Sequence, residues 1–324
     1  MKLGYKISSF ERYIGAISIT IVLLGGSLFF MSASVEAEER PIVVLLSPEI
    51  EAYQTAAKGA YETLKNYKRI TYTLDRNPEQ FRYVMEKVSL VNPEAVIAIG
   101  SQAILALKIH PINSPVIFCL ALNHTEALEI PDSWGISMHI PARDVYERIR
   151  SVFPKGRIGI PFNPDRTGTL IKDLVNFFSD TPIQLIPISV HAPSELSPAL
   201  KKMRSQFDIL WIQPDSSIID FFTVKFIIDY SISERIPLLG YSEAFAKNGA
   251  VLSLTGNYED MGRQAAETAM RIIAGERPER IQAPRRVSTF LNLRVARILD
   301  ISIGQDSVAM ADRIYPKDPE LRIP

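Results

Sequence analysis

The stretch AVIAIGSQAILALKIHPINSPVIFCLAL, residues 95–122, decides the fold. It opens with an apolar run at 95–99, continues through a helix-like segment at 101–109 and closes with a second apolar run at 116–122. Apolar runs of about four to eight residues, separated by a helical pattern, are typical of parallel strands that helices cover on both faces. The stretch therefore predicts a β-α-β unit.

The same alternation continues along the chain in both directions. Further strands are expected at 42–46, 157–161, 184–190, 209–212, 237–240 and 251–254. Helices are expected at 51–67, 78–91, 142–152, 167–178, 194–205, 216–233 and 257–274. The β-α-β-α order predicts an α/β fold of the doubly wound type. Because the residues that follow the signal at 1–37 still exceed what one core usually holds, two lobes are expected.

The N-terminal segment predicts export. Lys2, Lys6 and Arg12 precede an uncharged run, Tyr13–Val35, and the end of this segment has small residues at Val35 and Ala37. A basic segment, an apolar segment and a small-residue cleavage site define a secretory signal, here residues 1–37. The run is also long enough for an uncleaved membrane anchor, which needs about 20 residues. Both interpretations place the rest of the chain in a periplasmic or extracytoplasmic compartment.

Composition argues against a nucleic-acid partner and against disulfides. The 36 basic residues balance 36 acidic ones, whereas nucleic-acid binding requires a basic face. Cys119 is the single cysteine and lies in an apolar run, so it is expected to be a small buried hydrophobe.

Candidate binding residues follow the strands. In open α/β sheets, ligands bind outside the carboxyl ends of the strands, next to helix N-termini that attract anionic groups. The candidates at these positions are Ser47, Ser101, Gln102, Asn123, Asn163, Asp215, Tyr241 and Ser242. Ser, Asp and Asn are also the preferred helix caps, so capping alone explains any one of them. Together they predict a polar pocket.

Enzyme motifs are absent from the sequence. The segment GYSEA, residues 240–244, is similar to a nucleophile elbow, but its fifth residue is Ala and all four histidines lie upstream. The sequence has no G-x-G-x-x-G after the first strand, no G-K-[ST] and no His or Cys pattern of a zinc site. We expect no catalysis, no cofactor and no metal.

Three segments carry a family resemblance. They are VIAIGSQAILALK, residues 96–108; DILWIQPDSSI, residues 208–218; and IPLLGYSEAFAKNGAVLSLTGNYEDMGRQAAETAMRIIAG, residues 236–275. In order and spacing they resemble ABC-transporter substrate-binding proteins related to the tryptophan and tyrosine uptake proteins. The resemblance extends over essentially the whole chain after the signal.

The resemblance implies a type I periplasmic-binding-protein fold, with two doubly wound parallel-sheet lobes joined by three crossings and a ligand between them. The crossings are expected near 135–138, 253–256 and 284–287. The lobes are expected at 38–135 with 257–284, and at 136–256 with 285–324.

The resemblance also implies a function: an extracytoplasmic solute-binding protein of an ABC importer. It would capture a small organic solute, with amino-acid-like ligands as one option, by hinge closure, and deliver it to a membrane permease as a monomer. Asp215 would accept hydrogen bonds from a ligand ammonium and Ser101 would hold a carboxylate. Tyr53, Phe162, Tyr241 and Tyr258 lie near enough to strand ends to stack on a side group. The alternative function is an exported sensing domain that signals to a membrane partner.

The chain departs from the family pattern at two places. The loop after the first strand, residues 47–51, is acidic and contains Pro48. Residues 309–324 extend past the usual end of the family and contain prolines that prevent a regular helix.

Overall fold

The structure, a computed structural model, describes residues 40–48, 50–75, 77–122 and 124–316. The predicted signal at 1–37 and the candidate Asn123 lie outside the described residues. Within these ranges, no helix combines the length and apolar character that crossing a membrane requires.

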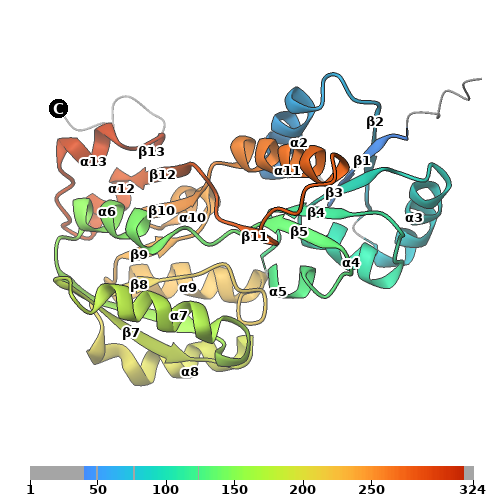
Figure 1. Cartoon of the computed structure of the whole chain (residues 1–324). Coiled ribbons are helices and arrows are strands. Elements are labelled where there is room, and N and C mark those ends of the chain that lie inside the picture. Colours follow the sequence, from blue (N-terminus) through green and yellow to red (C-terminus); the bar gives the residue numbers. More distant parts are fainter. Residues whose placement is uncertain (1–39, 49, 76, 123, 317–324) are drawn as a thin grey trace, which may run out of the picture. The chain divides into compact units, whose positions relative to one another are not determined.

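The described strands form two sheets, which appear in the right and left halves of Figure 1. The six-stranded sheet has the order β11-β5-β4-β3-β1-β2 and is parallel throughout. Its strands are β1 (Ile42–Leu46), β2 (Arg69–Thr73), β3 (Ala95–Ile99), β4 (Val116–Cys119), β5 (Ser133–Ile136) and β11 (Ile281–Gln282). We call this sheet with its covering helices the first lobe.

The seven-stranded sheet has the order β13-β12-β10-β9-β8-β6-β7. Its strands are β6 (Gly156–Phe162), β7 (Ile183–Ser189), β8 (Ile209–Trp211), β9 (Leu238–Gly240), β10 (Leu252–Gly256), β12 (Val287–Asn292) and β13 (Arg313–Tyr315). We call this sheet with its helices the second lobe. The first five strands of each lobe follow the same order, second-first-third-fourth-fifth, which is a doubly wound topology.

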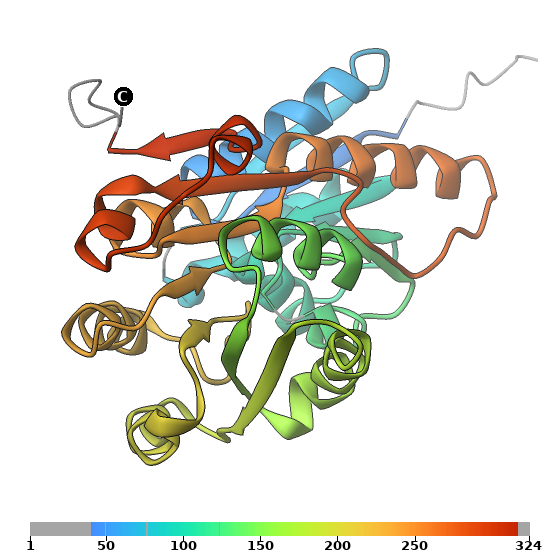
Figure 2. The same cartoon turned by 90° about the vertical axis from the view of Figure 1, so that its left-hand side faces the viewer.

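Helices cover both faces of each sheet, and Figure 2 shows this for the second lobe. The first lobe carries α2 (Glu51–Thr63), α3 (Phe81–Leu90), α4 (Ser101–Ile109), α5 (His124–Ala127) and α11 (Tyr258–Ile273). The second carries α6 (Ala142–Val152), α7 (Pro164–Phe178), α8 (Pro193–Met203), α9 (Phe221–Ser233), α10 (Glu243–Asn248), α12 (Leu293–Ile298) and α13 (Gln305–Ala309).

Both faces of the first sheet are buried, which explains its continuous apolar strands. In β1, Val44 packs in the core under α2 and α11, whereas Val43 packs in the opposite core under α3 and α4. Both side chains are fully buried. A strand with two buried faces needs apolar residues at every position, so the predicted parallel strands are confirmed.

The chain passes between the lobes three times (Figure 1). It leaves the first sheet after β5, returns from β10 to α11, and leaves again from β11 to β12. Residues 137–141, 257 and 283–286 connect these elements.

The two doubly wound parallel-sheet lobes expected from the sequence are confirmed; beyond the five parallel strands of the second sheet, β12 runs antiparallel to β10, with Leu252 opposite Leu291. One expected helix boundary in this lobe is wrong. The helix expected from Ser216 begins at Phe221, because Asp220 caps it and accepts a hydrogen bond from the Thr223 amide at 2.7 Å.

Helices α2 and α11 cross with almost no space between their backbones. A Cβ atom on Gly262 would lie 1.8 Å from the carbonyl oxygen of Ala56, and one on Gly59 would lie 1.9 Å from that of Glu259. The two glycines therefore let the helices approach each other closely. This contact holds α11 on the first lobe, although the chain reaches it from the second.

Candidate functional site

A cleft of about 650 Å³ lies between the two lobes. Residues of α2, of the start of α11 and of the segment after β4 line its first-lobe side; α10, β12 and β13 line the other. The volume falls within the range of small-molecule sites, about 300–1,000 Å³. The cleft therefore has the size and position of a ligand site.

Three tyrosines form a wall of this cleft: Tyr53 from α2, Tyr241 after β9 and Tyr258 from α11. Burial raises the pKa of all three phenols, that of Tyr258 to about 12. The neighbouring phenols raise the pKa of Tyr241 further. At neutral pH the wall is therefore uncharged and offers aromatic faces and hydroxyl groups to a ligand.

Four charged residues meet at the same cleft. Glu51 of the first lobe lies 3.6 Å from the Lys247 ammonium and 3.7 Å from the Arg313 guanidinium of the second. Glu243 lies 3.4 Å from Lys247 and 2.8 Å from Arg313, and it accepts a hydrogen bond from the Tyr315 hydroxyl. Burial alone would raise the pKa of Glu243, but these hydrogen bonds and positive charges hold it below its usual value.

Of the eight candidates at strand ends, Tyr241 and Ser242 line the cleft; of the other aromatic residues expected to stack on a ligand, Tyr53 and Tyr258 line it and Phe162 does not. The other described candidates are not among its lining residues. Ser47 and Ser101 bridge the carboxyl ends of strands in the first sheet: the Ser47 hydroxyl accepts a hydrogen bond from the Ala103 amide at 3.0 Å, and the Ser101 hydroxyl accepts one from Leu122 at 3.2 Å. Gln102 is half-buried, and its Oε1 has no hydrogen-bond partner among the described residues.

Asn163 and Asp215 lie together at the carboxyl ends of β6 and β8. Asn163 caps α7, accepting from the Asp165 amide at 3.0 Å, and its Nδ2 donates to the Ser217 hydroxyl at 3.1 Å. Asp215 is 1% exposed. Its carboxylate accepts from the Ser217 amide and hydroxyl, at 2.9 and 2.6 Å, and from the Thr167 hydroxyl at 3.0 Å. These hydrogen bonds join α7 to the loop after β8.

Sequence reasoning missed the charged residues of the cleft. Glu243 and Lys247 stand four residues apart directly after Ser242, which is a signal for one short helix face. Arg313 carries no comparable signal, because the pairing of β13 with β12 is what brings it to the cleft.

A second hollow, of about 750 Å³, lies on the first lobe near the C-terminal ends of α3 and α4. Its charged lining residues Arg82 and Glu86 pair with each other at 2.9 Å. It is remote from the carboxyl ends of the strands, where doubly wound sheets bind ligands, so we place the functional site in the cleft.

The described residues contain no group of three or more His, Cys, Asp or Glu side chains that could hold a metal ion. Cys119 is fully buried in β4, and burial raises its pKa to about 12. Within the described part of the chain, the polar side chains that line the cleft are hydroxyls, carboxylates, basic groups and the amide of Asn257.

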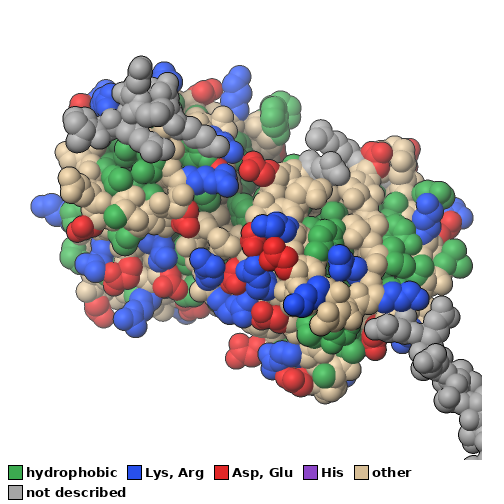
Figure 3. Space-filling view, turned by 90° about the horizontal axis from the view of Figure 1, so that it is seen from above, with side chains coloured by type: hydrophobic (Ala, Val, Ile, Leu, Met, Phe, Trp, Pro, Cys, Tyr) green, Lys and Arg blue, Asp and Glu red, His purple; other side chains and the backbone are tan. Residues whose placement is uncertain are grey.

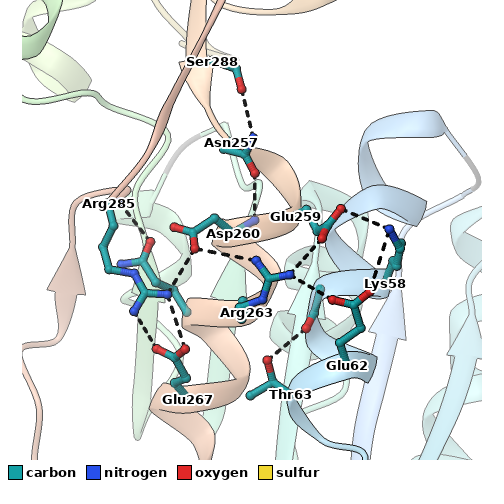
Figure 4. Close-up of polar contacts among 12 residues, drawn as sticks. Lys58, Glu62, Thr63, Asn257, Glu259, Asp260, Arg263, Glu267, Arg285 and Ser288 are labelled. Carbon is teal, nitrogen blue, oxygen red and sulfur yellow. Dashed lines mark hydrogen bonds and ion pairs between the residues drawn. The ribbon is translucent and has the colours of Figure 1, made fainter. Parts of the chain in front are cut away.

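A polar network next to the cleft ties α11 to α2 and to the crossing before β12 (Figure 4). Arg263 bridges Glu62 of α2, at 2.9 Å, and Glu259, at 2.8 Å. Arg285, in the crossing, lies 3.3 Å from Asp260 and 2.7 Å from Glu267. Acidic and basic side chains gather near the middle of the face seen from above (Figure 3).

Comparison with known proteins finds a similar relative, similar solved structures and a matching family model. A tyrosine-binding protein from Clostridioides difficile (strain R20291) is 20% identical over 204 residues, or 60% of this chain; the chain matches 57% of that relative's length.

Solved structures show the same fold. An ABC domain in complex with L-Trp from Streptococcus pneumonia has a TM-score of 0.62 at 18% identity, covering 84% of this chain and 99% of that one. The ligand-free, open structure of a substrate-binding protein with adhesive properties from Clostridium difficile has a TM-score of 0.63 at 14% identity. The match covers 85% of this chain and 98% of that one. The family model of the ABC transporter substrate binding proteins matches residues 49–314. The chain belongs to this family, which is one of substrate-binding proteins and not of enzymes.

Proposed function

We propose that this chain is the extracytoplasmic receptor of an ABC importer and captures a small organic solute between its lobes. The observation that carries the proposal is the cleft of about 650 Å³ with Tyr53, Tyr241 and Tyr258 on its wall. Aromatic faces with polar tips suit a solute that has an apolar or aromatic part and a few polar groups.

The mechanism that follows is capture by closure. Tyr53 belongs to the first lobe and Tyr241 to the second, so a solute that contacts both favours the closed arrangement. A solute shifts the equilibrium between the open and closed forms only as far as it binds the closed form more tightly than the open one. The closed form would then deliver the solute to a permease in the membrane. The expected signal at 1–37 would export the protein to the compartment in which it meets that permease.

Amino acids with aromatic side chains are the first solute class to test. The relatives named above include a tyrosine-binding protein and a structure with L-Trp. Tyr53, Tyr241, Ser242 and Tyr258 are the sequence-predicted residues that would contact such a solute. Asp215 remains the candidate partner for the ammonium group of such a solute. For that role its carboxylate would have to give up hydrogen bonds that it now accepts from Thr167 and Ser217.

A thermal-shift titration tests the proposal. Purified protein is melted with L-tyrosine, L-tryptophan, L-phenylalanine, other amino acids and small sugars, because a solute that binds only the folded state raises the midpoint. We expect at least one solute to raise it, and Tyr53→Ala to abolish the rise. Tyr83→Ala is the control, since Tyr83 lies on α3 and is 64% exposed. An equal rise in both variants would place the solute elsewhere.

A further inference from the structure

We propose that Lys247 and Arg313 form a subsite for a carboxylate of the solute, and that Glu51 occupies this subsite in the present arrangement. The proposal rests on the proposed function and adds the chemistry of the solute to it: an organic acid or amino acid whose body lies along the tyrosine wall. We call Lys247 and Arg313 the carboxylate subsite.

The geometry of Glu51 is that of a bound carboxylate. Its two oxygens face different cations: Oε2 is 3.6 Å from Lys247 Nζ, and Oε1 is 3.7 Å from Arg313 Nη1. The carboxylate comes from the opposite lobe, and its own backbone lies in the first turn of α2, where the cleft begins. A solute carboxylate between the same two cations would make the same pair of contacts.

Three charged side chains of the second-lobe wall favour such an anion, although the wall also carries the negative Asp312. Glu243 is negative, whereas Lys247 and Arg313 are both positive, so this group carries one surplus positive charge when Glu51 is left out. Glu243 pairs with both cations through one oxygen, Oε1, which also accepts from Tyr315. Asp312, also in the cleft lining, accepts a hydrogen bond from the Thr289 amide at 2.7 Å.

Glu51 is held loosely compared with Glu243. The side chain of Glu51 is 70% exposed, and its contacts exceed the 2.7–2.9 Å typical of charge-assisted hydrogen bonds. The side chain of Glu243 is only 14% exposed and meets Arg313 at 2.8 Å. Exposed ion pairs contribute little to stability, so a solute carboxylate can replace Glu51 but not Glu243.

The subsite depends on the last described strand, most of which lies inside the family match: the match reaches residue 314, so the extension expected from residue 309 begins later. Arg313 and Tyr315 belong to β13, which pairs with β12 and places them opposite Phe290 and Asn292. Lys247 lies 5.9 Å from the centre of the Tyr315 ring, which helps to fix its ammonium. The family model ends at residue 314, so Tyr315 lies beyond it.

Matched acid and amide probes test the proposal. Binding of L-tyrosine and L-tyrosinamide, and of 4-hydroxyphenylacetate and its amide, is measured by calorimetry. We expect at least one acid to bind tenfold or more tightly than its amide, and the variant Lys247→Gln/Arg313→Gln to lose this preference. Glu51→Gln should bind the acid several-fold more tightly, because its neutral amide competes less well for the cations. Arg82→Gln, on α3, is the control and should leave both affinities unchanged.

Each other outcome overturns a defined part of the account. Equal binding of acids and amides would remove the carboxylate subsite and leave the proposed function standing. If Glu51→Gln binds the acid more weakly, Glu51 stabilises the contact between the lobes and does not compete with the solute carboxylate. If neither acids nor amides bind, and no solute of the thermal-shift panel does, the proposed function fails together with the subsite. Circular dichroism of each variant shows whether it has folded.

Discussion

Asn257 and Ser288 connect two of the three segments that join the lobes: Asn257 Nδ2 donates a hydrogen bond to the Ser288 hydroxyl at 3.1 Å (Figure 4). The backbone amide of Asn257 donates a hydrogen bond to the Arg286 carbonyl at 2.8 Å. The side-chain Oδ1 of Asn257 accepts a hydrogen bond from the backbone amide of Asp260 at 3.0 Å. One side chain therefore caps α11 and ties this helix start to the neighbouring crossing.

Substitution of Asn257 separates these two roles. Asn257→Asp keeps an acceptor for the Asp260 amide but loses the donor to Ser288, so it should cost about 1 kcal/mol of unfolding free energy. Asn257→Ala also loses the cap and should cost about 2 kcal/mol. Urea denaturation measures both, with Ser288→Ala as the control expected to match Asn257→Asp. If all three variants are equally stable, the cap contributes nothing.

The crossing of α2 and α11 should not tolerate a methyl group. Gly262→Ala places a Cβ 1.8 Å from the Ala56 carbonyl oxygen, so the helices must separate. We expect a loss of about 2–3 kcal/mol in the free energy of unfolding. Gly168→Ala is the matched control: Gly168 lies inside α7 with no atom within 4 Å of an added Cβ, and Ala there should stabilise by about 0.5–1 kcal/mol. Equal effects at both positions would contradict the close contact.

Cys119 should make stability depend on pH above neutrality. Burial raises the pKa of its thiol from 9.0 to about 12, so folding favours the protonated form. This contribution is complete below pH 9 and is lost as the pH rises towards 12. The stability of the protein should fall over this range, and less steeply in Cys119→Ala. Native Cys119 should also resist iodoacetamide at pH 8 and react after denaturation; rapid native labelling would show that the thiol is accessible.

Asp215 is expected to stabilise the second lobe. Asp215→Ala leaves the Thr167 hydroxyl and the Ser217 amide without their acceptor, which should cost about 1–3 kcal/mol in a denaturant titration. The ligand role predicted from the sequence adds a second expectation, a tenfold or larger weakening of solute binding. A lowered unfolding midpoint with unchanged affinity would leave Asp215 with a structural role alone.

The sequence predicts the parallel strands well because burial on both faces forces an apolar residue at every position. Residues 95–99 and 116–119 are strands for this reason. The strands that it misses lack this signal: β2 alternates exposed and half-buried residues at the edge of its sheet, β5 is buried but includes Ser133 and Gly135 and so is no apolar run, and β11 has two residues. Long-range pairing defines β12 and β13, and no local pattern encodes it.

The candidate site is predictable only in part. Tyr241 and Ser242 follow from the rule that ligands bind at strand ends, and the structure places both on the cleft. The same rule selects Ser47 and Asp215, whose polar atoms bond to neighbouring segments of the chain. Glu51, Lys247 and Arg313 meet only through tertiary packing, so spacing in the sequence could not bring them together.

The distance between the lobes, measured with and without solute, tests the central claim most directly. Spin labels at Lys87→Cys on α3 and Lys201→Cys on α8 report on one lobe each, and both positions are exposed. Cys119 is fully buried and should not be labelled. Addition of a solute that raises the melting midpoint should shift the distance distribution to a single closed population. An unchanged distribution in the presence of saturating solute would contradict capture by closure.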